Sequence, residues 1–207
     1  MMNTRHILFM ILTAIGLAAC KKEQLPVPEK PNVELPDSPT ISYKELNRKL
    51  KASDVNPMNL DVNDDGVIDY SYFLQYAVMS GTVRLYAGVN PVFGSSTAAG
   101  EQNDEEFLNM GHLHSFTVTM PIQSTLTWTQ EHSILGVRYE DPNGGNRTYA
   151  GQWGNGQPTI MSARLSVNGK THYGWIRLKF DKVTEELILI DAAWNTITDQ
   201  AIKAGAK

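Results

Sequence analysis

Apolar and polar residues alternate with a period of two over much of this chain. The strongest run covers residues 68–78 and is followed by a Ser80-Gly81 turn and a weaker run at residues 83–87. Such alternation is typical of a strand with one buried face. The first run places six apolar side chains on one face: Ile68, Tyr70, Tyr72, Leu74, Tyr76 and Val78.

The clearest hairpin lies near the C-terminus. Residues 161–167 alternate up to Asn168-Gly169, and residues 171–180 alternate again. Asn-Gly is the preferred pair for a two-residue hairpin turn, because both positions need a positive φ. Residues 187–190 are all apolar, which indicates a strand buried on both faces.

Other segments are shorter. Further strands are predicted at residues 112–120, 126–128, 134–139 and 148–153, with a turn at 141–146. Residues 42–52 space Tyr43, Leu46 and Leu50 at helical intervals and predict a short helix. Residues 88–109 lack a pattern and predict a long loop. Many short strands with little helix predict a mostly β chain with a single antiparallel β-sandwich or jelly-roll-like domain.

The first 40 residues differ from this pattern. Residues 1–19 read as an export signal, with an apolar core too short to span a bilayer as a helix. Leu17-Ala18-Ala19-Cys20 has the form of a bacterial lipobox, in which the cysteine is acylated, as with palmitate. The alternative is an ordinary signal peptide that ends near a cysteine. Residues 20–40 hold five of the ten prolines and predict a semi-rigid linker before a domain at residues 41–207.

The leader sets the expected location. We expect a lipid anchor in the outer membrane, and both the periplasmic face and the cell surface stay open. Lys21-Lys22-Glu23 partly resembles a surface-export signal.

Charge and cysteine content narrow the function classes. The chain has 18 basic and 22 acidic residues with no basic block, so nucleic acid is not an expected partner. Cys20 is the only cysteine, which excludes an intramolecular disulfide framework and a zinc site built from several cysteines.

The most informative chemistry lies at residues 61–69. Asp61, Asn63, Asp65 and Asp69 carry oxygen ligands at the spacing of a calcium loop, with the Val67 carbonyl as a further ligand. Gly66 permits the sharp bend. Tyr72 stands at position 12, where an EF-hand has glutamate, so a helix–loop–helix sensor is not expected. The alternative is an Asp-Gly turn without metal.

Two other residue sets are candidates for metal or ligand binding. His112 and His114 share a face of a predicted strand, a spacing that suits a metal, but half-buried structural histidines are the favoured interpretation. Trp153 lies among Gly151, Gly154 and Gly156 and is, of the four tryptophans, the one predicted to be exposed as a ligand contact, although core packing is the favoured interpretation for any single tryptophan. Trp175, inside an alternating strand, is predicted to be core packing.

The C-terminal region resembles a group of secreted bacterial proteins without an established activity. The resemblance rests on His172-Tyr173-Gly174-Trp175-Ile176-Arg177-Leu178, Asp191-Ala192-Ala193-Trp194-Asn195 and Ala201-Ile202-Lys203-Ala204-Gly205, with an acidic Asp-Gly-x-x-Asp segment near the domain start. Trp194 stands where the group usually has tyrosine, and Ala201 where proline precedes isoleucine. The resemblance implies an exported β domain and carries over no catalytic residue.

These patterns favour a non-catalytic, membrane-anchored, calcium-stabilised domain that binds or adheres to an external glycan or protein. No nucleophile elbow, phosphate loop or zinc-protease motif is present in the sequence. A carbohydrate-active enzyme on a jelly-roll scaffold and a ligand-free envelope structural protein are the alternatives.

Overall fold

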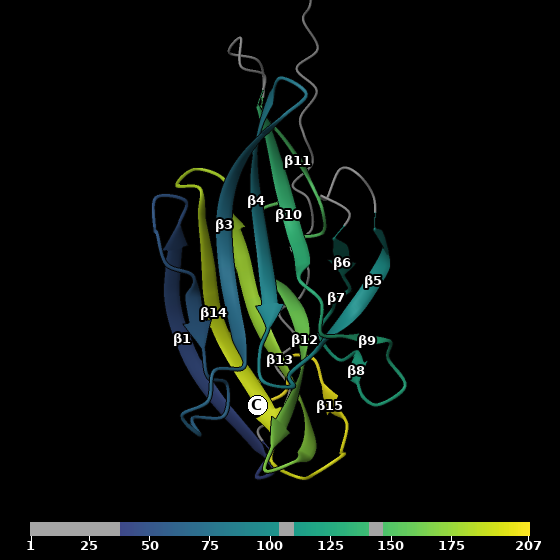
Figure 1. The fold of residues 1–207 in the computed structure, drawn as a ribbon. Coiled ribbons are helices and arrows are strands. Elements are labelled where there is room, and N and C mark those ends of the chain that lie inside the picture. Colours follow the sequence, from purple (N-terminus) through teal and green to yellow (C-terminus); the bar gives the residue numbers. More distant parts are fainter. Residues whose placement is uncertain (1–37, 104–109, 141–146) are drawn as a thin grey trace, which may run out of the picture. The chain divides into compact units, whose positions relative to one another are not determined.

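The chain is all β wherever its structure is described. The computed structural model describes residues 38–103, 110–140 and 147–207 (Figure 1). Among these residues there is no helix of the length and apolarity needed to cross a membrane. The predicted signal peptide, Cys20, nearly all of the linker and the predicted turn at 141–146 lie outside the described residues.

Two main sheets make up the described part of the chain. The first has five strands in the spatial order β1 (Ile41–Lys51), β14 (Glu186–Asn195), β13 (Lys170–Asp181), β12 (Thr159–Val167) and β7 (Ser115–Phe116). The second has eight strands: β2 (Met58–Leu60), β3 (Tyr70–Met79), β4 (Thr82–Pro91), β10 (Ser133–Glu140), β6 (Gly111–Leu113), β5 (Thr97–Asn103) and β9 (Trp128–Thr129), with β11 (Thr148–Ala150) also paired to β10. All pairings are antiparallel except β10 with β6.

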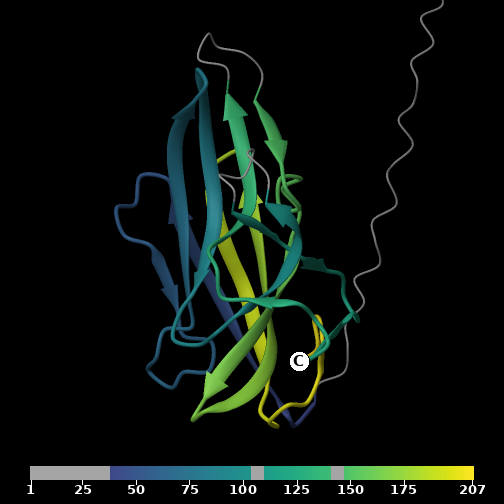
Figure 2. The same cartoon turned by 45° about the vertical axis from the view of Figure 1, so that its right-hand side comes forward.

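The main core lies between these sheets, as a β-sandwich requires. Alternate residues of β3 and β4 from one sheet meet alternate residues of β12, β13 and β14 from the other. Tyr70, Tyr72, Met161, Ile176 and Leu189 are among the fully buried members. The prediction of a mostly β chain is therefore confirmed, and the two sheets are consistent with a β-sandwich (Figure 2).

A second core covers the outer face of the five-stranded sheet. Strand β15 (Ile202–Lys203) pairs with β8 (Pro121–Ile122), and the residues that follow β15 continue over that face. Trp175 is fully buried there, and its indole N–H donates to the Ala206 carbonyl at 2.9 Å. The prediction that Trp175 is core packing is confirmed.

The helix predicted at residues 42–52 is wrong. These residues form β1, which pairs with β14 along most of its length, and ladder hydrogen bonds outweigh a weak local pattern. A bulge between Glu45 and Arg48, with Asn47 at φ 47°, shifts the alternation of side chains. The three-residue spacing from Tyr43 to Leu46 reflects opposite faces of a bulged strand.

Two further predictions hold only in part. The loop expected at residues 88–109 contains the end of β4 and all of β5, and residues 104–109 lie outside the described part. In β14, Leu187 and Leu189 are fully buried, whereas Ile188 and Ile190 are only partly buried, so burial on both faces is incomplete.

Candidate functional site

The acidic loop between β2 and β3 is held in shape by its own side chains. The two carboxylate oxygens of Asp61 accept the N–H groups of Asp64 at 2.7 Å and Gly66 at 2.8 Å. Asn63 accepts the N–H of Asp65 at 3.2 Å, and Asp65 accepts that of Val67 at 2.9 Å. These contacts are Asx-type turns, in which a short acidic or amide side chain replaces a backbone acceptor.

Gly66 meets the conformational requirement of this loop. Its φ is 85°, in the left-handed region that side chains with a Cβ disfavour. Nothing lies within 4 Å of the position that a Cβ would occupy. The glycine is therefore needed for the backbone conformation and not for a close contact.

Asp69 joins the acidic loop to the turn between β4 and β5. Its side chain is only 4% exposed and accepts the Val62 N–H at 2.8 Å and the Ser95 hydroxyl at 3.0 Å. Its carbonyl accepts the Val92 N–H at 2.8 Å. Burial raises the pKa of Asp69, the charges of Asp61 and Asp65 raise it further, and the bonds from Val62 and Ser95 lower it. Asp69 thus faces into the protein, beneath the other acids.

Lys44 on β1 supplies a cation to the same loop. Its ammonium donates to the Asp61 carbonyl and to a carboxylate oxygen of Asp64, each at 2.6 Å. Because Asp64 is highly exposed, this ion pair stabilises the protein little. It neutralises one of the three outward acids, and no ion pair among the described residues involves Asp61 or Asp65.

The loop offers oxygen ligands of the type that calcium prefers. Their number is small, as is typical of a weak calcium site. Asp61, Asn63, Asp65 and the Val67 carbonyl belong to one tight turn, whereas calcium takes six to eight oxygens. The residues that are described contain no group of three or more His, Cys, Asp or Glu side chains arranged to hold a metal ion. Asn63 and the carbonyl would have to contribute, and water would have to complete the shell.

The prediction that Trp153 is exposed is wrong. It is 1% exposed, and its backbone N–H donates to the Leu135 carbonyl at 3.4 Å. A Cβ at Gly151 would lie 2.7 Å from the Cα of Gly136, so the glycines let the loop lie against β10 and turn the indole into the core. Glycines here signal close backbone approach and not an exposed loop.

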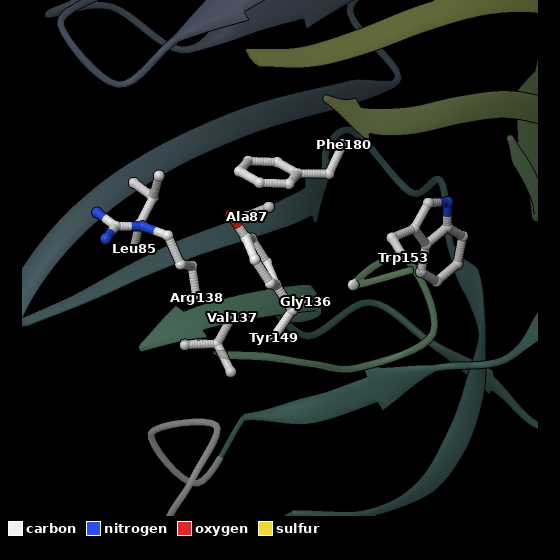
Figure 3. A pocket seen from close by; sticks show the side chains of 9 residues that line it. Leu85, Ala87, Gly136, Val137, Arg138, Tyr149, Trp153 and Phe180 are labelled. Atoms are coloured by element: carbon white, nitrogen blue, oxygen red, sulfur yellow. The ribbon is translucent and has the colours of Figure 1, made fainter. Parts of the chain in front are cut away.

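A small cavity lies beside Trp153. It measures about 10 Å³ and is lined by Leu85, Ala87, Gly136, Val137, Arg138, Tyr149, Trp153, Gly154 and Phe180 (Figure 3). The indole nitrogen of Trp153 points away from Tyr149 and Phe180 in this view. Since the volume is that of about one water molecule, no organic ligand fits.

The histidines weighed as metal ligands lie in structural surroundings. His114 packs edge-on against Phe116, with ring centroids 4.7 Å apart, and His112 is partly buried. This agrees with the favoured interpretation of half-buried strand histidines.

The C-terminal motifs contact one another at the pairing of β13 with β14. A Cβ at Gly174 would lie 2.6 Å from the Ala193 carbonyl, so only glycine allows β13 and β14 to pair here without a shift. His172 donates through Nδ1 to the Asn195 carbonyl at 2.9 Å, and the Asn195 amide donates to the Ala201 carbonyl at 3.1 Å. These bonds join the start of β13 to the end of β14 and to the segment just before β15.

Comparison of the chain with protein-family models, with curated proteins and with solved structures finds no match in any of the three. The candidate site therefore rests on the chain's own geometry.

Proposed function

We propose that this protein is an exported lipoprotein, acylated at Cys20 and anchored in the outer membrane, whose β-sandwich domain binds an external glycan or protein. Calcium strengthens the 61–69 loop through Asp61, Asn63, Asp65 and the Val67 carbonyl, and Asp69 fixes the loop to the domain from below. The observation that supports this most is the loop itself, preformed by side chain–backbone bonds at one end of a β-sandwich. Loops at the ends of such scaffolds commonly carry binding function.

The expected affinity for calcium is low. The proposed ligands are three side chains and one carbonyl, fewer than the six to eight oxygens that calcium takes, which places the loop with extracellular calcium modules whose Kd lies at about 10⁻⁴–10⁻³ M. The metal supplies stabilisation and no chemical step. Within the loop, Asp61 and Asp65 bring the negative charge, and Asn63 and Val67 bring neutral oxygens.

A carbohydrate-active enzyme on a jelly-roll scaffold is the second candidate. It would need two carboxylates facing one groove about 5–9 Å apart. Glu185 and Glu186 are adjacent acids in the described part of the chain: Glu185 lies 2.8 Å from Arg147, and Glu186 lies between Lys49 at 3.4 Å and Lys51 at 3.6 Å. These ion pairs favour a structural role for both, so the binding function is the better supported.

A glycan array probed with the full chain, once in millimolar calcium and once in EDTA, tests the proposal. We expect specific glycan binding in calcium and at least a several-fold loss in EDTA, because an ordered loop preorganises the neighbouring surface. Glycan binding of equal strength in both buffers would show that recognition does not depend on calcium. No binding in either would contradict glycan recognition and leave a protein ligand or an envelope structural role.

A further inference from the structure

Among the described residues, three turns have two consecutive central residues of positive φ, and one of these turns carries an unexpected residue. In each, both central residues have positive φ: Ser80-Gly81, Asn168-Gly169 and Phe93-Gly94. Such turns strongly prefer asparagine, aspartate or glycine at the first position. A bulky aromatic residue at φ 47° is an outlier, and an outlier of this kind is a reason to look for function.

Phe93 gains no burial in return for this strain. Its side chain is 73% exposed, although a phenylalanine is ordinarily among the more buried residues. In the acidic loop, Val67 is also exposed, at 45%. The Asp69 side chain and carbonyl connect the Phe93 turn to this loop, so we call Val67 and Phe93 together the apolar tip.

The turn that carries Phe93 is held firmly. The Ser95 N–H donates to the Val92 carbonyl at 3.0 Å, and the backbone of Ser96 exchanges two hydrogen bonds of 2.9 Å with Arg164 on β12. Ser95 and Ser96 are both buried. An aromatic side chain on a rigid turn loses little conformational freedom on binding, which favours an interaction role.

The described chain begins at the same end of the sandwich. Ile41, at the start of β1, pairs with Asn195, and this row continues across β13 and β12 to the Ser96–Arg164 bridge, just after the Phe93 turn. The β3–β4 turn lies at the other end, because Tyr70 pairs with Pro91 and Met79 with Thr82 (Figure 1). The segment that leads back to Cys20 is therefore attached at the end that carries the apolar tip.

From this arrangement we infer that the apolar tip docks on the bilayer that holds the lipid anchor. This inference rests on the proposed lipidation of Cys20. A tether attached at the tip's own end raises the effective concentration of the bilayer there, so two apolar side chains suffice to orient the domain. Exposed apolar side chains partition into the boundary between headgroups and acyl chains.

The acidic residues beside the apolar tip determine which lipid charge the tip can approach. Within the acidic loop and its ion pair, Asp61, Asp64 and Asp65 outnumber Lys44, so a strongly anionic surface repels the loop unless calcium is bound. The expected partner is a predominantly zwitterionic lipid surface, or an anionic one in the presence of calcium. A glycan or a protein pocket over the tip would be a different partner.

The test uses the full lipidated chain in vesicles of phosphatidylethanolamine and phosphatidylcholine. Because Cys20 is the only cysteine and is consumed by acylation, Phe93→Cys and Val78→Cys each provide a single thiol for an environment-sensitive fluorophore. Val78 is the matched control, since it is 74% exposed at the opposite end. We expect lipid-borne quenchers to reduce the signal at position 93 at least threefold more than at position 78.

A second variant separates docking from folding. Phe93→Asn relieves the strain, so we expect it to raise Tm by about 2–4 °C. With a fluorophore on Val67→Cys, the same substitution should remove most of the lipid quenching at the tip. Equal quenching at positions 93 and 78, no quenching at 93, or unchanged quenching at 67 with Phe93→Asn would overturn the inference.

The outcomes separate this inference from the proposed function. Vesicles that retain the chain while position 93 stays in water would contradict tip docking and leave the lipid anchor and the glycan-array result standing. A chain that does not incorporate lipid at Cys20 would contradict the anchor itself. Quenching at 93 that appears only on anionic vesicles with calcium would support both docking and the calcium site.

Discussion

The two ends of the sandwich balance their charges in different ways. At the end with the β3–β4 turn, Arg138 is paired with Glu140 and lies 3.2 Å from Glu185, which also accepts from Arg147 at 2.8 Å. At the other end, the Lys44 ammonium pairs with Asp64 and donates to the Asp61 carbonyl, and no ion pair among the described residues involves Asp61 or Asp65. The acids of the first cluster are neutralised by the protein's own side chains, whereas the acidic loop keeps carboxylates that an external cation would neutralise.

The difference shows how a structural charge and a binding charge can be distinguished. A charge that is buried and paired, as Arg138 is with Glu140 and Glu185, belongs to the structure of the fold, because its removal leaves the partner charges uncompensated. Exposed acids that are bonded mainly to the turn they belong to, as Asp61 and Asp65 are, hold a shape that remains open to solvent. This contrast supports the proposal that the acidic loop takes part in binding.

The largest expected effect on stability comes from removing Arg138, at the end with the β3–β4 turn. Arg138→Ala removes a side chain that is 2% exposed and leaves Glu185 with fewer partners, so we expect about 2–4 kcal/mol of destabilisation. Arg147→Ala is the matched control, since that side chain is 47% exposed and a surface pair contributes about 1 kcal/mol or less. Urea unfolding measures both. Equal losses for the two variants would contradict the assignment of Arg138 as the central charge.

A smaller effect concerns the acid titration of the two ends. The bond from Arg138 lowers the pKa of Glu140, so its stabilisation is present above the ordinary pKa of 4.5 and is lost as pH falls through the lowered value. Burial raises the pKa of Asp69, so its contribution to stability is present at low pH and is lost as pH rises through the raised value. Lowering the pH therefore changes the contributions of Glu140 and Asp69 to the free energy of unfolding in opposite directions.

Carboxyl carbon resonances followed by NMR in EDTA check this order. Glu140 should titrate at lower pH than Asp69, and Arg138→Ala should move Glu140 back toward 4.5 without affecting Asp69. An Asp69 that titrates at or below 3.8 would show that its bonds to Val62 and Ser95 outweigh burial.

Much of the fold could be predicted because strand alternation is a local property. The β12–β13 hairpin follows from Asn168-Gly169, and β3 from its six alternating apolar residues. The helix predicted at residues 42–52 failed because a bulge is fixed by pairing with β14, which local spacing does not contain. The loop predicted at residues 88–109 hid β5, whose pairings with β6 and β9 join residues 8 to 32 positions apart along the chain.

The candidate site could also be predicted only in part, because some of its features depend on distant residues. The turn from Asp61 to Val67 depends on short-range bonds, so the spacing of its acids was informative. The inward position of Asp69 depends on Ser95, 26 residues away, and the burial of Trp153 depends on the close approach of Gly151 to β10. Phe93 carried a usable signal, because phenylalanine before glycine in a two-residue turn departs from the usual turn composition.

The most direct test of the calcium proposal is a pair of thermal melts of the full chain, in millimolar calcium and in EDTA, with two variants. At ten times its Kd, a single site adds about 1.4 kcal/mol, or about 3–6 °C in Tm. We expect this shift in the wild type and in Asp64→Ala, whose side chain bonds Lys44, and its loss in Asp65→Ala. A wild-type Tm that is identical in both buffers, or a calcium shift that survives Asp65→Ala, would contradict the proposal that the loop binds calcium.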